Sequence, residues 1–336
     1  MTNIYEIAEQ MVAEGKGILA ADESSGTIKK RFDTIDVASS EENRMNYRRI
    51  LFESKEAMEN YISGVILFDE TIRQSNNQGE RLVDIIKSSG VLPGIKVDMG
   101  AKDLAKMSGE TVTEGLDGLR ERLQEYSDLG AKFAKWRAVI SISEENPSSL
   151  CINANAHALA RYAALCQESN IVPIVEPEVL MDGSHNIQKC YDVTKETLLR
   201  VFDELLKHKV DLKGICLKPN MIVDGSETPK KSTPREIAEM TVSCFMDCVP
   251  KEVPGIVFLS GGQSEIEATQ NLSEINKIKN TPWKLSFSYG RALQSSALQA
   301  WQGKSENENS CSKAFSHRAK MNSLASKGMW SNELEI

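Results

Sequence analysis

Eight short apolar runs recur along the chain of 336 residues, with segments of helical character between them. Each run is continuously apolar rather than alternating, which is typical of strands that are buried on both faces. Such strands alternating with helices indicate a parallel sheet, and the number eight favours closing that sheet into a barrel. The runs are GILAAD from Gly17, SGVILFD from Ser63, GIKVD from Gly94, AKFAKWR from Ala131, NIVPIVEPE from Asn170, LKGICLKP from Leu212, PGIVFLSGG from Pro254 and WKLSFSYGR from Trp283.

The segments between the runs carry signals for helix starts and apolar faces. Ser39 to Glu42 has the capping-box pattern, and Thr233-Pro234-Arg235-Glu236 places a proline at the first helical position. The segment 196–207 is expected to present one apolar stripe, made of Leu198, Leu199, Phe202, Leu205 and Leu206.

A doubly wound open sheet with a nucleotide site is the structural alternative, but it would need a GxGxxG fingerprint after the first strand. The sequence there is AADESSG, and the chain contains no Walker A motif. We therefore predict an α/β fold, a single-domain (β/α)8 TIM barrel with extra helices over residues 1–328 and a C-terminal tail over residues 329–336. Residues 303–312 are expected to be poorly ordered and residues 313–328 to be helical.

The charge balance limits the classes of partner. Forty basic and 48 acidic side chains give a formal net charge of −8, which argues against a sequence-independent nucleic-acid binder. A small anionic substrate is compatible with this total, because a few local Lys and Arg side chains override a mildly negative charge. No window reaches the ~18 apolar residues of a membrane span, so no membrane partner is expected.

Seven cysteines without a CxxC pair, and an N-terminus without an apolar run, predict reduced thiols in a cytoplasmic protein. Cys216 could act as a nucleophile, but its place within an apolar run favours a small buried side chain. The four histidines show no HExxH or HxxEH spacing, so the sequence predicts no metal site.

Charged side chains stand at the carboxyl ends of most runs, where barrels of this type carry their chemistry. One charged strand end is commonly no more than a solvated position. Lys135 and Lys218, however, follow apolar residues within their runs, and charged groups are rarely fully buried unless they are paired. Carboxylates at the same barrel mouth would allow that pairing. The residues concerned are Asp22, Glu23, Lys96, Asp98, Lys135, Arg137, Glu176, Glu178 and Lys218.

Two lysines beside carboxylates suit carbonyl chemistry through an imine. An attacking amine must be neutral, which costs a lysine with a reference pKa near 10.4 about 4.6 kcal/mol at pH 7. An apolar wall and a second ammonium both favour the neutral form, and Lys135 would supply that second charge to Lys218. The carboxylates would then move protons.

The loops after the last two runs suit a phosphate group. Ser260-Gly261-Gly262 and Gly290-Arg291 each precede a predicted helix, and small residues let backbone N–H groups approach an anion at a helix start. Loops after strands seven and eight are a frequent phosphate site in this fold. A flexible turn is the alternative for either loop alone, but two such loops together with an arginine favour phosphate.

Nine motifs follow one another along the chain: GILAADESSGTIKKRF, VILFDETIRQ, GIKVDMG, GLDGLRERLQEY, AKFAKWR, PIVEPE, LKPNM, FLSGGQSE and FSYGRALQ. Over roughly residues 4–328 they resemble the class I fructose-bisphosphate aldolases. The resemblance implies a TIM barrel that forms a homotetramer and acts in glycolysis and gluconeogenesis. It also implies cleavage of fructose 1,6-bisphosphate into dihydroxyacetone phosphate and glyceraldehyde 3-phosphate through a lysine Schiff base, without a metal or other cofactor.

The resemblance assigns roles by motif. Lys218 in LKPNM resembles the Schiff-base lysine, and Glu176 in VEPE resembles the acid/base for the carbinolamine and imine protons, supported by Glu178. Asp22 resembles the residue that assists proton transfer and orients the C4 hydroxyl, and Lys135 resembles an electrostatic partner. The other implied substrate contacts are Lys96 and Arg137, then Ser260, Gly261, Gly262, Ser288, Gly290 and Arg291 for the C1 phosphate, and Ser24, Thr27, Lys30, Arg31 and Arg44 for the second phosphate.

Three positions depart from the family pattern. Thr27 replaces Ser and keeps the hydroxyl, whereas Asp69 replaces His, either as a change behind the site or as altered local charge. No tyrosine follows Tyr289, so the C-terminal tyrosine of much of the family is missing. Two alternatives therefore stay open: an aldolase for another phosphorylated ketose, such as fructose 1-phosphate or sedoheptulose 1,7-bisphosphate, and an aldolase-like scaffold that binds a protein.

Overall fold

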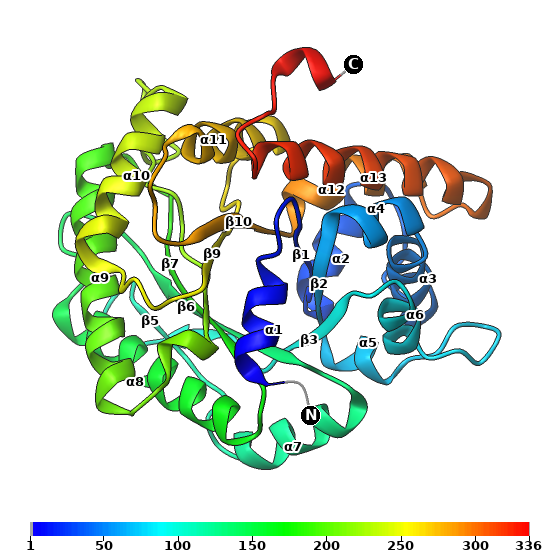
Figure 1. Ribbon diagram of the computed structural model, residues 1–336, viewed down its shortest axis with the longest axis horizontal. Coiled ribbons are helices and arrows are strands. Elements are labelled where there is room, and N and C mark those ends of the chain that lie inside the picture. The colour runs from blue at the N-terminus through cyan, green and yellow to red at the C-terminus, as the bar shows by residue number, and fades with distance from the viewer. Residues whose placement is uncertain (1–2, 336) are drawn as a thin grey trace.

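Eight parallel strands close into a barrel with helices on its outside (Figure 1). The computed structural model describes residues 3–335. The strand order is β1-β10-β9-β8-β7-β6-β3-β2, and each predicted run overlaps one of these strands, which confirms the predicted TIM barrel. The strands are β1 (Gly17–Ala21), β2 (Ile62–Leu67), β3 (Leu92–Lys96), β6 (Phe133–Ile140), β7 (Val172–Val179), β8 (Cys216–Leu217), β9 (Gly255–Phe258) and β10 (Lys284–Tyr289).

Helices fill the connections between strands, and an antiparallel hairpin of β4 (Ala101–Asp103) and β5 (Thr111–Thr113) follows β3. The helices are α1 (Ile4–Met11), α2 (Ser25–Asp33), α3 (Glu41–Phe52), α4 (Lys55–Tyr61), α5 (Asp69–Arg73), α6 (Leu82–Ser88), α7 (Leu119–Leu129), α8 (Ser149–Glu168), α9 (Ile187–Lys207), α10 (Pro234–Cys248), α11 (Glu265–Lys277), α12 (Arg291–Trp301) and α13 (Glu308–Ala325), with short 3-10 helices η1 (Leu212–Gly214), η2 (Ser305–Asn307) and η3 (Asn332–Glu335). Within residues 3–335, no helix combines the length and apolar character that a bilayer crossing needs.

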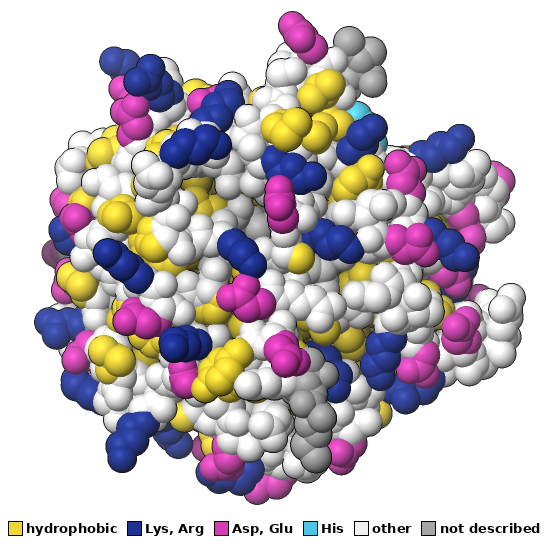
Figure 2. Space-filling view, in the orientation of Figure 1, with side chains coloured by type: hydrophobic (Ala, Val, Ile, Leu, Met, Phe, Trp, Pro, Cys, Tyr) yellow, Lys and Arg dark blue, Asp and Glu magenta, His cyan; other side chains and the backbone are white. Residues whose placement is uncertain are grey.

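The amino end of the barrel is closed by apolar side chains. Helix α1 lies across this end (Figure 1), and its Met11 and the following Val12 belong to a buried cluster with Phe133 of the barrel interior. Two glycines make room for Phe133, because a Cβ on Gly94 would lie 2.2 Å from its ring and one on Gly64 would lie 2.9 Å from it. Basic and acidic side chains are interspersed over the outer surface on this side (Figure 2). The carboxyl end of the barrel is therefore the end left for a site.

The two predicted helix starts have different outcomes. Thr233 caps α10 in a full capping box, and Pro234 is its first helical residue, as predicted. The capping box predicted at Ser39 is wrong, because Ser40 caps α3 instead and accepts a hydrogen bond from the N–H of Asn43.

The predicted apolar stripe on α9 is narrower than its sequence suggests. Leu198, Phe202 and Leu205 are buried, at the spacing that one helix face requires. Leu199 and Leu206 are exposed to 47% and 60%, so their assignment to the buried stripe is wrong. Both follow a buried residue by one position, and a step of one residue turns a side chain about 100° around the helix.

The last part of the chain is more regular than predicted. η2 lies within residues 303–312 and α13 begins at Glu308, so the predicted poor order there and the helix start at residue 313 are wrong. The described tail lies against α13, where Glu335 pairs with Arg318 and accepts a hydrogen bond of 2.8 Å from the indole N–H of buried Trp330. The division into a barrel of residues 1–328 and a tail stays a prediction, and residue 336 lies outside the described residues.

Candidate active site

A pocket of about 660 Å³ opens at the carboxyl ends of the barrel strands. Its residues come from β1, β3, β6, β7 and β10 and from the segments that follow β1, β3, β8, β9 and β10. All the predicted catalytic and substrate-binding residues except Arg44 and Gly262 line it. They are Asp22, Ser24, Thr27, Lys30, Arg31, Lys96, Lys135, Arg137, Glu176, Glu178, Lys218, Ser260, Gly261, Ser288, Gly290 and Arg291.

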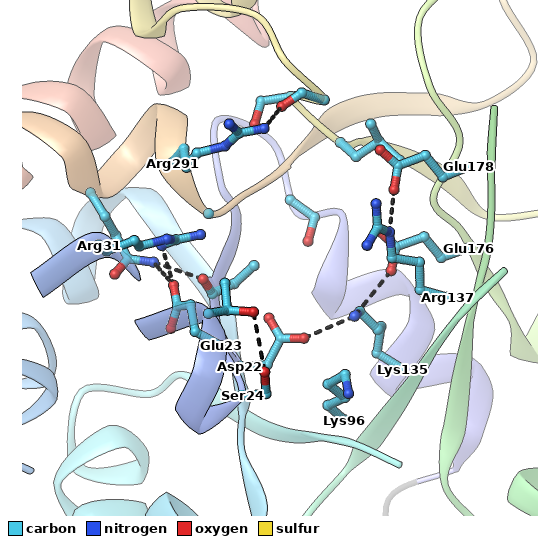
Figure 3. Close-up of a pocket in the computed structure, with 18 of the residues that line it drawn as sticks. Asp22, Glu23, Ser24, Arg31, Lys96, Lys135, Arg137, Glu176, Glu178 and Arg291 are labelled. Atoms are coloured by element: carbon cyan, nitrogen blue, oxygen red, sulfur yellow. Dashed lines mark hydrogen bonds and ion pairs between the residues drawn. The ribbon is translucent and has the colours of Figure 1, made fainter. Parts of the chain in front are cut away.

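Two buried lysines share one buried carboxylate in this pocket. Lys218 Nζ lies 3.1 Å from Oε1 of Glu176, and Lys135 Nζ lies 3.3 Å from Oε2 of the same group. On its other side, Lys135 Nζ lies 2.9 Å from Oδ2 of Asp22 (Figure 3). The four side chains therefore form one continuous chain of alternating charge, Lys218–Glu176–Lys135–Asp22.

The surroundings fix the charge of two of these groups. Burial alone raises the pKa of Asp22, but the ammonium groups of Lys135 and Lys218 outweigh burial and hold that pKa well below its usual value. Burial alone lowers the pKa of Lys135, but the carboxylates of Asp22 and Glu176 outweigh it and raise that pKa well above its usual value. At neutral pH, Asp22 is a carboxylate and Lys135 is an ammonium.

Two further ion pairs stand beside this chain of charges. Arg137 Nε contacts Glu178 Oε2 between β6 and β7, and Lys96 Nζ lies 2.9 Å from Asp98 Oδ1 at the end of β3. Side chains two positions apart share a strand face, which is why each strand sends a pair into the pocket. The spacing places Asp98 on the face of Lys96, as expected, although no role is predicted for Asp98. Its carboxylate lies 4.0 Å from Lys135 Nζ.

The loops after β9 and β10 present backbone N–H groups, a hydroxyl and a cation to the pocket. Gly261 has φ 57°, and Gly290 precedes α12 without a side-chain cap, so the first N–H groups of that helix have no side-chain partner. The hydroxyl of Ser288 is buried and makes no hydrogen bond. Arg291 donates to the carbonyl oxygen of Gly261, which joins the two loops. Such a set suits a phosphate monoester.

Helix α2 brings a second set of hydroxyls and cations to the pocket. Ser24 Oγ lies 3.1 Å from Thr27 Oγ1, and Arg31 pairs with Glu23. Arg31 Nη2 lies 3.4 Å from the position that a Cβ on Gly290 would take, so this guanidinium stands between the two sets. Glu23 lines the pocket as well; the sequence places it at the end of the first run beside Asp22, but the prediction gives it no role.

Two predicted phosphate contacts are already engaged elsewhere. Arg44 Nη2 lies 2.6 Å from Glu70 Oε2, and the N–H of Gly262 donates to the thioether of Met181 at 3.1 Å. Glu70 would have to move before Arg44 could bind a phosphate, and Met181 would have to move before Gly262 could. Asp69 also lies outside the pocket and forms an ion pair on α5. None of the described tail residues 329–335 lines the pocket.

No histidine or cysteine is among the residues that line the pocket, and Cys216 is buried inside the barrel as predicted. Elsewhere in residues 3–335 the structure brings together one group that could hold a metal ion, His157, Glu204 and His208. Sequence reasoning missed this group because the packing of α8 on α9 creates it. Its only local signal is the four-residue spacing from Glu204 to His208.

The charge of the pocket differs from that of the whole chain. Seven basic and five acidic side chains line it, whereas the formal charge of the chain is −8. A local positive excess attracts an anionic ligand despite the negative total. A TIM barrel that carries two lysines on one carboxylate, beside loops suited to phosphate, defines an enzyme that works on the carbonyl group of a phosphorylated substrate.

Known proteins identify the family. The family model for fructose-bisphosphate aldolase class-I matches residues 3–335. A probable fructose-bisphosphate aldolase class 1 of Xanthomonas axonopodis is 52% identical over 97% of this chain and 98% of its own length. Cytosolic fructose-bisphosphate aldolase 4 of Arabidopsis thaliana is 53% identical over 96% and 82%. A solved structure of fructose-bisphosphate aldolase from Plasmodium falciparum, in complex with TRAP and a small-molecule inhibitor, matches with a TM-score of 0.96 and 47% identity over 98% and 95% of the two chains. The chain belongs to the class I fructose-bisphosphate aldolases, a family of lyases.

Proposed function

We propose that this chain reversibly cleaves fructose 1,6-bisphosphate into dihydroxyacetone phosphate and glyceraldehyde 3-phosphate through an imine on Lys218. The observation that carries the proposal is the position of Glu176, whose two carboxylate oxygens lie 3.1 Å from Lys218 Nζ and 3.3 Å from Lys135 Nζ. The names of the relatives supply the sugar, and the positive excess of the pocket supports a substrate with two phosphates.

The first half of the reaction forms the imine. Transfer of a proton from Lys218 to Glu176 supplies both a neutral amine and the acid for the next step. The amine attacks the C2 carbonyl of the open-chain sugar, and the carbinolamine loses water when Glu176 returns the proton to its hydroxyl. Lys135 stays charged throughout, because the carboxylates of Asp22 and Glu176 both stabilise its ammonium group.

The second half cleaves the sugar. A base removes the proton of the C4 hydroxyl, the C3–C4 bond breaks, and its electron pair moves into the protonated imine to give an enamine and glyceraldehyde 3-phosphate. Asp22 orients the C4 hydroxyl and assists this transfer, since it stays ionised beside Lys135. Protonation of the enamine at C3 and hydrolysis of the imine release dihydroxyacetone phosphate and free Lys218.

The remaining groups hold the substrate. Arg137, anchored by Glu178, and Lys96 contact the sugar between its phosphates. Arg44 and Gly262 would join only after Glu70 and Met181 release them. The C1 phosphate is assigned to Ser260, Gly261, Ser288, Gly290 and Arg291, and the second phosphate to Ser24, Thr27, Lys30 and Arg31.

Borohydride trapping tests the imine. The protein is incubated with dihydroxyacetone phosphate, reduced with borohydride, digested and read by mass spectrometry. One adduct is expected, on the peptide that carries Lys218, and none on the folded Lys218→Ala variant. An adduct that persists in Lys218→Ala would overturn the assignment of this lysine.

The proposal also covers the cofactor and the assembly. The family resemblance supports a reaction without metal, so cleavage should survive EDTA, and a loss of activity that Zn²⁺ restores would contradict this. It also supports a homotetramer in the cytoplasm, which light scattering and localisation of the tagged chain test.

The preferred sugar is a separate question. The ratio kcat/KM is expected to be highest for fructose 1,6-bisphosphate when compared with fructose 1-phosphate and sedoheptulose 1,7-bisphosphate. A higher ratio for either of the other sugars would reassign the substrate. No turnover of any of the three would favour the scaffold alternative.

A further inference from the structure

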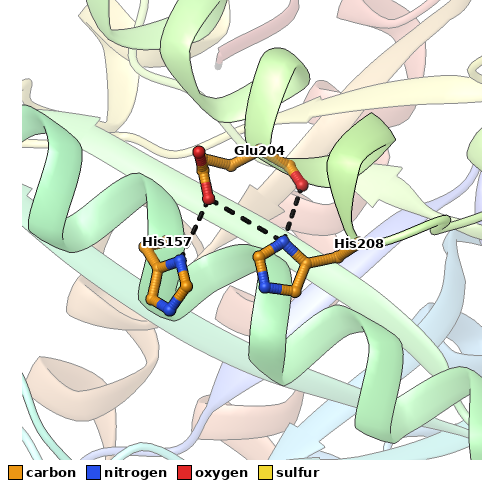
Figure 4. Close-up of side chains that lie close together, drawn as sticks. All are labelled: His157, Glu204 and His208. Carbon is orange, nitrogen blue, oxygen red and sulfur yellow. Dashed lines mark hydrogen bonds and ion pairs between the residues drawn. The ribbon is translucent and has the colours of Figure 1, made fainter.

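Two histidines and a glutamate converge on the outside of the barrel, away from the aldolase pocket. His157 lies on α8, Glu204 lies in the last turn of α9, and His208 directly follows that helix. His157 Nδ1 lies 3.0 Å and His208 Nδ1 lies 3.8 Å from the same oxygen, Oε2 of Glu204. Figure 4 shows both rings turning a nitrogen toward this carboxylate.

These distances suit a transition-metal ion. Nitrogen and oxygen ligands lie about 2.0–2.2 Å from Zn²⁺, so neighbouring ligand atoms around a tetrahedral ion lie roughly 3.3–3.5 Å apart. The two nitrogen–oxygen distances bracket that value, and the three ligand atoms all lie within 4.8 Å of one another. Small side-chain rotations would therefore complete the geometry.

The protonation states required are accessible. His208 Nδ1 lies 2.9 Å from the carbonyl oxygen of Glu204, so it carries the ring proton there. His157 Nδ1 likewise carries its ring proton, because it faces the carboxylate of Glu204 at 3.0 Å. A shift of the proton to Nε2 in each ring leaves both imidazoles neutral and frees both Nδ1 atoms as ligands.

The site is partly shielded and open on one side. The side chains of Glu204 and His208 are exposed to 20% and 24%, and that of His157 to 53%. His208 also borders a surface hollow of about 440 Å³, which leaves room for a water molecule as a fourth ligand. Lys207 Nζ lies 3.1 Å from the other oxygen, Oε1 of Glu204, and competes with a cation.

We propose that His157, Glu204 and His208 form a binding site for Zn²⁺ that ties α8 to the carboxyl end of α9. Two imidazoles and one carboxylate with a vacant position are a known zinc ligand set. The site serves stability rather than catalysis, because α9 leaves the barrel mouth after β7 and ends at the opposite face, where it leads through η1 into β8. An ion that binds only the folded state raises the melting temperature.

Titration of metal-free protein with ZnCl2 tests the proposal. Isothermal titration calorimetry is expected to give one saturable site, with a parallel rise in melting temperature. His157→Ala should weaken Zn²⁺ binding by at least about 10-fold, because losing even a residue that only supports a metal ligand weakens binding by about 10- to 100-fold. Lys207→Ala should tighten it by roughly 2- to 5-fold, since an exposed competing charge is lost.

Matched variants separate this site from other zinc binding. His317→Gln removes a histidine outside the group, and Glu196→Gln removes an exposed acid of α9 two turns before Glu204. Both should bind as the wild type does. His208→Asn should bind as weakly as His157→Ala. Circular dichroism confirms that each variant is folded. Absence of saturable binding in the wild type, or wild-type affinity in both histidine variants, would overturn the proposal. Anomalous scattering at the zinc edge should place the ion among these three side chains.

Discussion

The two ends of the barrel are built on different principles. At the carboxyl end, buried charges neutralise one another, as Glu176 does between Lys218 and Lys135. At the amino end, the buried cluster around Phe133 is apolar, and glycines provide its space. The charged end depends on electrostatic complementarity and the apolar end on volume. Function and stability can therefore be altered separately, which the following variants exploit.

The largest expected effect is on proton transfer at the charged end. Glu176→Gln keeps the shape of the side chain but removes the group that exchanges protons with Lys218. We expect kcat to fall by roughly 100- to 10,000-fold, the usual contribution of a general acid or base. Steady-state cleavage of fructose 1,6-bisphosphate by the folded variant measures this.

Glu178→Gln is the matched control on the same strand face. Glu178 pairs with Arg137, whereas Lys218 and Lys135 pair with Glu176. Its loss should raise KM more than it lowers kcat. Equal losses of kcat in the two variants would contradict the distinct role given to Glu176.

The sequence predicted the charged end better than the details around it. Apolar runs and charged strand ends revealed Lys135, Lys218 and Glu176, because period-two geometry and burial are local properties of a strand. The eight runs likewise predicted the closed barrel, which the structure confirms.

Features that depend on contacts between distant segments escaped prediction. The pairing of Arg44 with Glu70 and the group of His157 with His208 form only when separate elements pack together. The exposure of Leu199 likewise depends on how far neighbouring helices cover α9, and the periodicity of the sequence carries no information about that. Roles for the site residues rest on the family resemblance and stay predictions.

Asp22→Asn tests how the charged end responds to pH. The pKa of Asp22 is depressed in the folded state, so its charge contributes stability above the unfolded value of about 3.9. That contribution is lost as pH falls through the lower folded pKa. The cost at neutral pH should stay below the roughly 3–5 kcal/mol of a fully broken buried pair, because Glu176 and Asp98 still face Lys135.

Urea unfolding of both proteins at several pH values provides the measurement. The difference in free energy of unfolding between wild type and Asp22→Asn should be constant from about pH 5 to pH 9, where Asp22 stays ionised and Lys135 stays charged. Below about pH 4 the difference should shrink as the wild type loses its advantage. A difference that grows in acid would show that the carboxylate is destabilising.

Gly94→Ala probes the apolar end by volume alone. The added Cβ would lie 2.2 Å from the ring of Phe133, which must move within a filled barrel. Overpacking of this kind costs about 1–3 kcal/mol of unfolding free energy, while kcat/KM should stay near the wild-type value. Gly26→Ala is the control, because nothing lies within 4 Å of its added Cβ. Equal stability of the two variants would mean that the barrel interior is less tightly filled than the distances indicate.

The smallest effect is expected at Asp69, which lies just after β2 on the side of the barrel mouth but outside the pocket. Its carboxylate pairs with Arg73 at 2.9 Å, and its side chain is exposed to 47%. Exposed pairs contribute about 0–1 kcal/mol, so Asp69→Asn should change the unfolding free energy by no more than that and leave kcat/KM unchanged. A loss of activity greater than about 10-fold would mean that charge at the mouth matters beyond the buried groups. The residues important for activity would then be defined by their position at the carboxyl end of the barrel, and not by their burial.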